Sequence, residues 1–361
     1  MNSPMVMIKA DRLQNLVGDI FSAAGCSRVE AARIARYLVA ANLAGHDSHG
    51  VVRVPRYVEM KKDGRVVADQ TVAVTVDTPV FAVVDGKFGF GQSVAPQAVA
   101  IGIEKCKAMG LSAVSLRNSG HVGRVGDWAE MAAAAGLISI HFVNAGGSVL
   151  VAPFGGAERR FSTAPYCVGV PLPGRAPLVL DFATSVVAEG KVLVASQGGK
   201  KIPAHALVGP NGEMSGDPTL LYGEHTPTGP RDFRKGTGAI RAFGDHKGSG
   251  LALMCEILGG ALTGNGCASL ERPSANGMFS LYVDPSRIDP EHIFPPEAVR
   301  YVDHVKSAKP SEPGGAVLVP GEAEEKSRAK RLAEGILLPD DTWTSIMATA
   351  RSVGLTAVAA Q

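Results

Sequence analysis

The sequence predicts an α/β fold, and three observations support this prediction. Short apolar runs typical of buried strands alternate with longer segments whose apolar residues recur at helical spacing. Between residues 80 and 143, strands and helices alternate, which is typical of helices packed on a sheet. The chain has 361 residues, of which 45% are hydrophobic, so it can bury a large core and form two or three structural units.

Helices near the N-terminus are predicted from periodicity and stop signals. Segments 11–24 and 30–44 carry apolar residues three and four positions apart, and a glycine follows each segment. A third helix is expected between Pro55 and Gly64, because proline suits the first turn of a helix and glycine suits its end. The second helix therefore presents the polar residues that follow it at its C-terminal end.

The remaining elements follow from the same signals. Region 198–238, rich in glycine, proline and charge, is predicted to be mostly loop and a candidate mobile lid, and 303–315 is predicted to be a linker. Further helices are expected at 93–109, 127–135, 251–262 (opened by Gly248), 322–334 and 341–353. Strands are expected at 71–76, 80–84, 111–116, 137–143, 178–182, 278–283 and 316–319.

The composition argues against several classes of protein. The net charge is +2 without a basic stripe, so no nucleic-acid partner is expected. No run approaches the roughly 18 apolar residues of a membrane span, and residues 1–9 lack the apolar stretch of a signal peptide. The five cysteines are scattered without a CxxC pair, which fits buried thiols in a reducing cytoplasm better than disulfides or a zinc site. We expect a cytoplasmic protein without a membrane partner.

Polar and titratable groups gather directly after the helix over 30–44. The run His46-Asp47-Ser48-His49-Gly50 is followed by Arg53, Arg56 and Tyr57. Such a set suits the binding of a small anionic substrate and the movement of a proton. Arg53 is the preferred carboxylate binder, because a planar guanidinium can bond both oxygens; Arg56 is an alternative, and a solvated helix charge is the simpler interpretation.

A second polar stretch, 117–124, follows the predicted strand over 111–116. Within it, His121 lies next to a glycine and faces no apolar stripe, so we predict that it acts as an acid/base rather than as a surface loop histidine. Asp181 lies near the end of the predicted strand over 178–182. Its carboxylate is predicted either to accept ribose hydroxyls or to cap the segment after it, since ligand groups often gather at strand ends.

The usual dinucleotide fingerprint is missing. No GxGxxG motif stands between a strand and a helix, and no phosphate-binding loop of the GxxxxGK type occurs. Phosphates can still be held at helix N-termini, and the best candidate is the run His246-Lys247-Gly248-Ser249-Gly250 before the apolar helix. The alternative is a simple helix start with Lys247 in solvent.

Ordered matches along nearly the whole chain resemble one family. The chain is similar to the malate/L-lactate dehydrogenase family that lacks a Rossmann fold, which also includes cyclic-imine reductases acting on piperideine-2-carboxylate. The matching segments are Ala40-Ala41-Asn42-Leu43-Ala44-Gly45-His46-Asp47-Ser48-His49-Gly50, Asn118 to Gly123, Val151-Ala152-Pro153-Phe154-Gly155-Gly156, Leu180-Asp181-Phe182-Ala183-Thr184-Ser185, His246-Lys247-Gly248, Met254 to Leu262 and Pro320-Gly321-Glu322.

The resemblance implies an activity and a set of roles. It implies an oxidoreductase that interconverts a small 2-hydroxy acid and its 2-oxo acid with NAD or NADP, in a homodimer whose site lies near the subunit interface. His121 matches the family's proton-transfer histidine, and His49, Arg53 and Tyr57 match positions around the substrate, His49 being a possible second acid/base. The positions that match cofactor contacts are Ser48, Gly123, Arg124, Asp181, Phe182, Ala183, His246, Lys247, Pro320, Gly321 and Glu322.

The resemblance also implies a non-Rossmann mixed sheet and a division of the chain. We expect a mainly helical substrate and dimer domain from residues 1–75 with 305–361, and a nicotinamide-binding α/β domain from 76–304. Two departures stand out: Ser162-Thr163-Ala164-Pro165 replaces the usual Gly-Thr-Asn-Pro, and Ala206-Leu207 stands where the family usually carries an aspartate.

Three other functions remain open. A cyclic imine-2-carboxylate reductase would keep the fold and need the same carboxylate clamp and proton donor. A metal-assisted hydrolase or lyase would use His46 and His49, but no distant cluster offers the third and fourth ligands, so no metal is expected. A non-catalytic binding protein is disfavoured because the polar set is intact. No motif separates NADH from NADPH.

Overall fold

The structure, a computed structural model, describes residues 5–196, 201–224 and 232–355. By internal contacts the chain forms two compact units. One contains Phe142–Tyr166 and Phe182–Phe279, and the other contains Met5–His141, Cys167–Asp181 and the chain from Ser280 onward. The predicted domains are a substrate and dimer domain of 1–75 with 305–361 and a nicotinamide-binding domain of 76–304. They stay a prediction.

A seven-stranded sheet has the order β2-β3-β4-β12-β5-β7-β8. Strand β2 is antiparallel to β3, whereas β3 is parallel to β4, so the sheet is mixed, as expected. The strands are β2 (Ala73–Asp77), β3 (Phe81–Asp85), β4 (Leu111–Ser119), β5 (Ile138–Ala145), β7 (Pro165–Val170), β8 (Leu178–Ala183) and β12 (Asn276–Val283).

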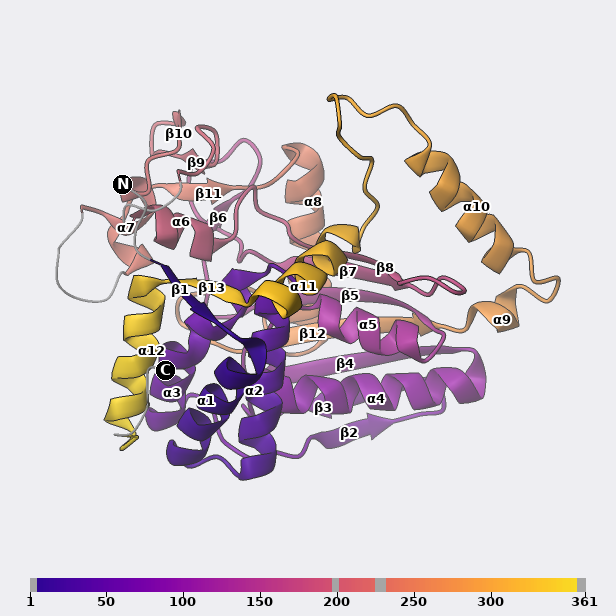
Figure 1. Cartoon of the computed structure of the whole chain (residues 1–361), viewed down its shortest axis with the longest axis horizontal. Helices are drawn as coiled ribbons and strands as arrows, with labels where there is room; N and C mark the ends of the chain where they lie inside the picture. Colours follow the sequence, from indigo (N-terminus) through magenta and orange to yellow (C-terminus); the bar gives the residue numbers. More distant parts are fainter. Residues whose placement is uncertain (1–4, 197–200, 225–231, 356–361) are drawn as a thin grey trace. The chain divides into compact units, whose positions relative to one another are not determined.

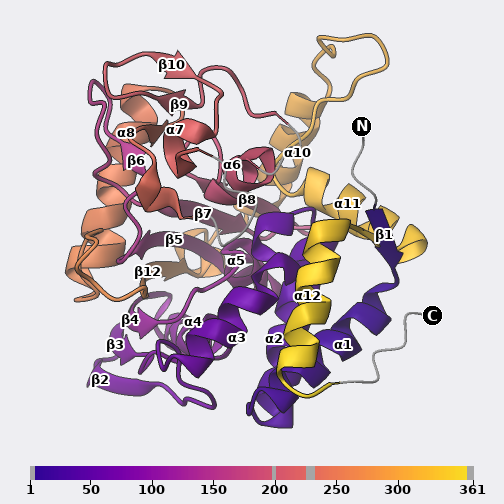
Figure 2. The same cartoon turned by 90° about the vertical axis from the view of Figure 1, so that its left-hand side faces the viewer.

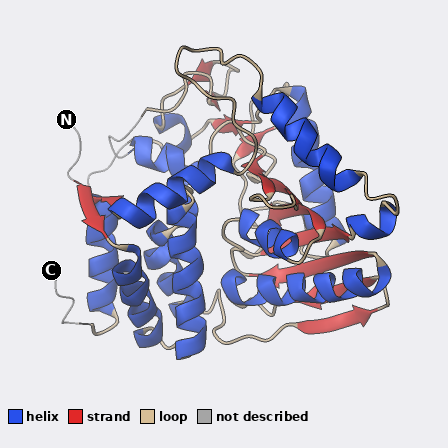
Figure 3. Ribbon diagram, turned by 45° about the vertical axis from the view of Figure 1, so that its right-hand side comes forward, coloured by secondary structure: helices blue, strands red, loops and turns tan. Residues whose placement is uncertain are grey.

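Helix α4 (Gly91–Met109) connects β3 to β4 and lies along them (Figure 3). It ends at Gly110, whose φ of 86° is a conformation that glycine adopts without a steric penalty. Because β3 and β4 are parallel, the residues that follow each strand emerge at the same edge of the sheet. The start of α4 and the loop after β4 therefore meet at that edge, and α5 (Gly126–Ala134) begins beyond the loop.

The N- and C-terminal segments build one helical layer (Figures 1 and 2). Their apolar side chains share a core to which α1, α2, α3 and α12 contribute, with Ile336 and Leu338 from β13. The predicted association of the two ends of the chain in a mainly helical part is therefore confirmed. The elements are β1 (Met5–Ile8), antiparallel to β13 (Ile336–Pro339), and helices α1 (Ala10–Ala23), α2 (Arg28–Leu43), α3 (Val54–Lys62), α11 (Glu322–Glu334) and α12 (Asp340–Ser352).

The other unit holds a small sheet of its own, in the order β10-β9-β11-β6. A core that includes Val151, Leu207, Leu221 and Ile240 supports it. Its elements are β6 (Val151–Ala152), α6 (Glu189–Ser196), β9 (Leu207–Val208), β10 (Met214–Ser215), α7 (Thr219–Tyr222), a 3₁₀ turn (Phe233–Lys235), β11 (Ala239–Arg241), α8 (His246–Cys255) and a π-helical continuation (Glu256–Leu262). In the described parts of both units, no helix is long and apolar enough to cross a membrane.

Several sequence predictions need correction. Residues 316–319 do not form a strand: they have no neighbouring strand, and the Val319 amide instead donates to the Glu322 carboxylate at the start of α11. The apolar helix begins at His246 rather than Gly248. Two helices were not predicted, α9 (Pro285–Ile288) and α10 (Phe294–Lys306). Because α10 extends to Lys306, the first residues of the linker expected at 303–315 are helical. Short elements interrupt the region 198–238, and its residues 198–200 and 225–231 lie outside the described ones.

Stability is expected to fall in acid because of His141, which is buried in β5 and pairs with the hydroxyls of Ser139 and Ser280 at 3.0 and 2.8 Å. Burial lowers the pKa of His141 from 6.5 to about 3. Between these values the unfolded chain binds a proton here and the folded protein does not, so stability decreases as the pH falls through this window.

Replacing this histidine with an amide should weaken that pH dependence. His141→Gln keeps hydrogen-bonding groups but does not titrate, so the slope of unfolding free energy against pH should drop by up to about 1.4 kcal/mol per pH unit. Urea unfolding at a series of pH values measures the slope, and the same substitution at the exposed His205 is the control. An unaltered slope in His141→Gln would contradict this account.

Candidate active site

The polar run after α2 is shaped by a buried asparagine. Helix α2 stops before Gly45, whose φ is 85°. The Asn42 amide then holds the loop from both ends: Oδ1 accepts the Val51 amide at 2.8 Å and Nδ2 donates to Asp47 at 2.6 Å. Two 3₁₀ turns result, Asp47–His49 and Val51–Arg53, and they lead directly into α3.

Helix α11 fixes the outer side of this loop. Arg331 donates to both carboxylate oxygens of Asp47, at 2.5 and 3.0 Å. His46 Nε2 lies 3.0 Å from the Glu324 carboxylate, and the hydrogen bond to His46 lowers the pKa of Glu324. Side chains of α11 therefore hold His46 and Asp47, whereas His49 makes its contacts with other parts of the chain.

His121 follows β4 and is held by close backbone contact. The Gly120 amide donates to the Gly89 carbonyl at 2.8 Å, across the turn that precedes α4. A Cβ on Gly91 would lie only 2.1 Å from the His121 carbonyl oxygen, so only glycine permits this approach. The start of α4 and the backbone of His121 are therefore pressed together.

Three rings converge at this point, and they come from two of the predicted clusters. Tyr57 Oη, on α3, lies 2.5 Å from His121 Nδ1. The His49 ring stacks on the His121 ring, with centroids 5.5 Å apart and planes 9° apart. The structure therefore brings together the residues predicted for proton transfer and for substrate contact, although they are up to 72 positions apart in sequence.

A buried amide completes this group of rings. Gln92, near the start of α4, donates through Nε2 to Tyr57 Oη at 3.3 Å and to the His121 carbonyl at 3.4 Å. The sequence analysis did not identify Gln92. The available signal was its position directly after the Gly89–Gly91 pair, at the predicted start of a helix after a strand.

Burial and charge keep these groups neutral. Burial, followed by the positive charge of Arg53, lowers the pKa of His121 to about 3. Burial lowers the pKa of His49 as well, reinforced by His121 and Arg53. Burial raises the pKa of Tyr57 to about 12, although Arg53 and the Gln92 hydrogen bond oppose the rise. At neutral pH the site therefore holds two neutral imidazoles and a neutral phenol beside one fixed cation.

Arg53 is that fixed cation. Its Nε donates to the Ser48 carbonyl at 2.6 Å, which orients the guanidinium. Ser48 Oγ in turn lies 3.1 Å from His49 Nδ1. Within the described chain, the terminal nitrogens of Arg53 have no hydrogen-bond or ion-pair partner, so its fork remains available for an anion.

Arg124 and Asp181 are already engaged by the protein. The Arg124 guanidinium is buried and bonds the carboxylates of Asp127 and Glu130, each at 2.8 Å. Burial raises the pKa of Asp127 to about 6 despite the pairing with Arg124. Asp181 Oδ2 accepts the Gly126 amide at 2.7 Å, so it caps α5. Their predicted cofactor contacts stay predictions, and any such contact would add to these bonds.

The other predicted cofactor residues lie at two helix starts, at one strand end and in the loop after His121. Pro320-Gly321-Glu322 precedes and opens α11, whose first turn carries three glutamates and therefore disfavours an anion. His246 and Lys247 open α8, whose first turn has no acidic residue and no side-chain cap. Phe182, at the end of β8, packs edge-on against Phe243, with ring centroids 5.2 Å apart. Ala183 follows it, and Gly123, with a φ of 75°, lies in the loop after His121.

The departure at 162–165 has a local explanation. The amide and hydroxyl of Ser162 both donate to the buried Glu256 carboxylate, at 2.9 and 2.6 Å. The same hydroxyl accepts the Ala164 amide at 3.2 Å. Ser162 thus holds this loop without an asparagine at 164. At the second departure, Ala206 is fully buried in the apolar core.

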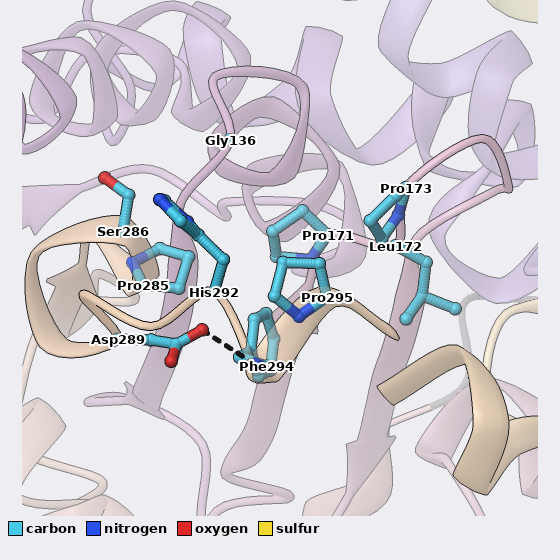
Figure 4. A pocket seen from close by; sticks show the side chains of 10 residues that line it. All are labelled: Gly136, Pro171, Leu172, Pro173, Pro285, Ser286, Asp289, His292, Phe294 and Pro295. Carbon is cyan, nitrogen blue, oxygen red and sulfur yellow. Dashed lines mark hydrogen bonds between the residues drawn. The ribbon is translucent and has the colours of Figure 1, made fainter. Parts of the chain in front are cut away.

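A cavity of about 240 Å³ lies apart from these groups (Figure 4). Prolines and Phe294 line most of it, and the Asp289 carboxylate at its edge accepts the Phe294 amide at 2.7 Å. None of the predicted site residues lines it.

Comparison with known proteins first identifies the class of enzyme. Over nearly its whole length, the chain is similar to dehydrogenases of hydroxy acids. The sequence profile of the malate/L-lactate dehydrogenase family matches residues 8–347, and the chain belongs to that family. Hydroxycarboxylate dehydrogenase B of Escherichia coli K12 is 38% identical over 353 residues, which cover 96% of this chain and 94% of that protein.

Solved structures agree with the family. Malate dehydrogenase from Pyrococcus horikoshii OT3 superposes with a TM-score of 0.84 at 29% identity, covering 97% of this chain and 96% of that one. The Δ1-piperideine-2-carboxylate reductase from Pseudomonas syringae pvar. tomato gives 0.79 at 27% identity, covering 96% and 100%. The predicted family, fold class and enzyme class, a dehydrogenase of hydroxy acids, are confirmed.

Removal of the buried Arg124 should strongly destabilise the protein. Arg124→Met leaves the buried Asp127 carboxylate without its cation, whereas Glu130 keeps its pair with Arg328 at 3.3 Å. We expect a loss of about 3 kcal/mol in unfolding free energy. The control is Arg300→Met, which breaks an exposed pair with Glu297 and should change stability little. Denaturant unfolding measures both, and equal effects would contradict the structural role of Arg124.

Proposed function

We propose that the enzyme interconverts a small 2-hydroxy acid and its 2-oxo acid with NAD or NADP. The observation that carries the proposal is His121, hydrogen-bonded to Tyr57 and stacked on His49, beside Arg53, whose terminal nitrogens have no partner among the described residues. A proton-transfer group and a carboxylate-binding group are the two things that this chemistry requires of the protein.

In this proposal, Arg53 binds the substrate carboxylate and Tyr57 and His49 border the reacting carbon. His121 gives a proton to the oxygen of the 2-oxo acid in reduction and takes it back in oxidation. Because the charge of Arg53 helps to keep His121 deprotonated, a bound carboxylate cancels part of that effect and raises the pKa of His121. Substrate binding thereby prepares the histidine to hold the proton that it must deliver.

The residues at the start of α8 fit the phosphates of a nicotinamide cofactor. The helix has ten residues, Lys247 is exposed in its first turn, and the Asp245 carboxylate that precedes the helix is paired with Arg241 at 2.8 Å. His246 packs edge-on against the exposed Phe154 ring, with centroids 5.9 Å apart, which adds an aromatic surface. When bound, the nicotinamide exchanges a hydride with the substrate carbon. Predicted contacts of Ser48, Asp181, Phe182 and Ala183 belong to the same proposal.

A panel assay tests this function. Purified enzyme is mixed with NADH or NADPH and with glyoxylate, hydroxypyruvate, phenylpyruvate or a cyclic imine carboxylate, and absorbance is followed. Consumption of the reduced cofactor with a 2-oxo acid is expected, and the faster cofactor is then identified. Folded enzyme that consumes neither cofactor with any 2-oxo acid would refute the proposal.

A cyclic imine-2-carboxylate reductase is the second candidate, favoured by the structural similarity to the piperideine-2-carboxylate reductase. It would use the same Arg53 clamp and His121 donor. In the panel assay, consumption with the imine alone would select this candidate.

The predicted homodimer and cytoplasmic location are part of the proposal. In α10, Val302 is the one buried residue, whereas Tyr301 is 58% exposed, so this helix offers apolar surface to a second copy. Light scattering of the purified protein measures the oligomeric state, and a monomer at micromolar concentration would remove the dimer from the proposal.

Arg53→Lys should raise the KM for the acid by on the order of ten-fold or more, because an ammonium group cannot form the two parallel bonds of a guanidinium. Steady-state kinetics with the best substrate measures it. Arg56→Lys is the matched control, since Arg56 is exposed on α3 and pairs with Glu59 at 2.7 Å. If Arg56→Lys raised KM and Arg53→Lys did not, the carboxylate binder would be Arg56.

A further inference from the structure

Gln92 lies directly behind the pair formed by Tyr57 and His121. Its side chain is buried, at 1% exposure, and its Nε2 donates to Tyr57 Oη at 3.3 Å and to the His121 carbonyl at 3.4 Å. Its Oε1 is buried and has no hydrogen-bond partner within the described chain. A half-turn of the amide exchanges two ends of the same shape and would place Oε1 on Tyr57 Oη, at the cost of the long bond to the His121 carbonyl.

The direction of the hydrogen bonds decides the tautomer of His121. A phenol has one proton, so a Tyr57 oxygen that accepts from Gln92 Nε2 directs its own proton to His121 Nδ1. Neutral His121 then carries its proton on Nε2. If the amide turns so that Oε1 faces Tyr57, the phenol donates to Oε1 and accepts from Nδ1–H, and Nε2 has a free lone pair.

Proton transfer at Nε2 requires the second arrangement. In oxidation, Nε2 must accept the proton of the substrate hydroxyl, so the proton on the neutral ring has to reside on Nδ1. In reduction, the ring must carry protons on both nitrogens before Nε2 gives one up. In both cases Nδ1–H donates to Tyr57, and Tyr57 needs an acceptor for its own proton. The free Oε1 of Gln92 is suited to that purpose.

The other groups around His121 do not substitute for this amide. His49 stacks on the ring, and its Nδ1 lies 3.1 Å from Ser48 Oγ. Arg53 contributes a positive charge and can only donate hydrogen bonds. Gln92 differs from His49 and Arg53, because its amide contacts Tyr57 Oη and can either donate or accept a hydrogen bond there.

We propose that Gln92 is a positioning residue that, through Tyr57, determines which ring nitrogen of His121 carries the proton. The inference rests on the proposed acid/base role of His121. Gln92 acts on the tautomer and is not assigned a contact with the substrate. The half-turn of its amide connects the resting arrangement to the one in which Nε2 exchanges a proton.

Two substitutions set the tautomer in opposite ways. Gln92→Glu supplies a carboxylate, which only accepts when ionised, so His121 should carry its proton on Nδ1. Gln92→Met supplies no acceptor, so Tyr57 should donate to Nδ1 and leave the proton on Nε2. Nitrogen-15 NMR of histidine-labelled enzyme without ligands, from neutral to alkaline pH where a glutamate ionises, reads the tautomer directly. The same tautomer in both variants throughout that range would overturn the proposal.

Kinetics gives the second readout. Gln92→Met should lower kcat by on the order of ten- to a hundredfold with KM nearly unchanged, as expected when a partner that orients a histidine is lost. Gln92→Glu should restore much of the activity and move the pH profile to higher pH, because a carboxylate favours the protonated ring. Wild-type kcat in Gln92→Met would contradict the proposal.

A control variant separates positioning from packing. Gln97 lies on the same helix and bonds only backbone groups, donating to the Gln70 and Ser93 carbonyls and accepting from the Val72 amide. Gln97→Met should reduce stability and leave both the His121 tautomer and the pH profile as in the wild type. The tautomer is measured without substrate, so the two proposals can fail independently. An enzyme inactive on every 2-oxo acid would refute the proposed function, whereas the NMR comparison of the variants would still test the role of Gln92.

Discussion

The close backbone contact between the turn before α4 and the end of β4 is the constraint on which the site depends. Parallel pairing of β3 and β4 brings both segments to one edge of the sheet. The glycines at 91 and 120 then permit an approach that a side chain would block. As a result, the His121 carbonyl accepts from Gln92 and its ring contacts Tyr57, which also accepts from Gln92. Without this contact, His121, the proposed acid/base group, would lie on a loop that lacks this support.

Around this contact the protein arranges neutral groups beside one cation. Burial keeps two histidines deprotonated and Tyr57 protonated; the charge of Arg53 reinforces this effect on the histidines and opposes it on Tyr57. Asn42 and the ion pairs from α11 hold the loop that carries His49 and Arg53, so these side chains are positioned by the protein's own contacts. Such preorganisation is what allows a small number of side chains to act on a bound acid.

The sequence predicted most of the elements and much of the site, and the exceptions have physical reasons. Strong periodicity and glycine stops located α1, α2, α4 and α11 to within about two residues. The strand expected at 316–319 failed because an apolar run becomes a strand only beside a partner, and none is available there. Gln92 was missed because its role depends on a neighbour 29 positions away, which no local pattern reports. Likewise, only coordinates could show that the Arg124 guanidinium is buried in ion pairs.

The central claim is that His121 transfers the proton, and the most direct measurement is turnover of His121→Gln. The substitution keeps similar size and hydrogen-bonding ability but has no acid/base function near neutral pH. Turnover with the best 2-oxo acid and cofactor should fall by on the order of a hundredfold or more, while thermal unfolding shows that the variant remains folded. Turnover close to that of the wild type would contradict the account and move the proton-transfer role to another group, His49 first.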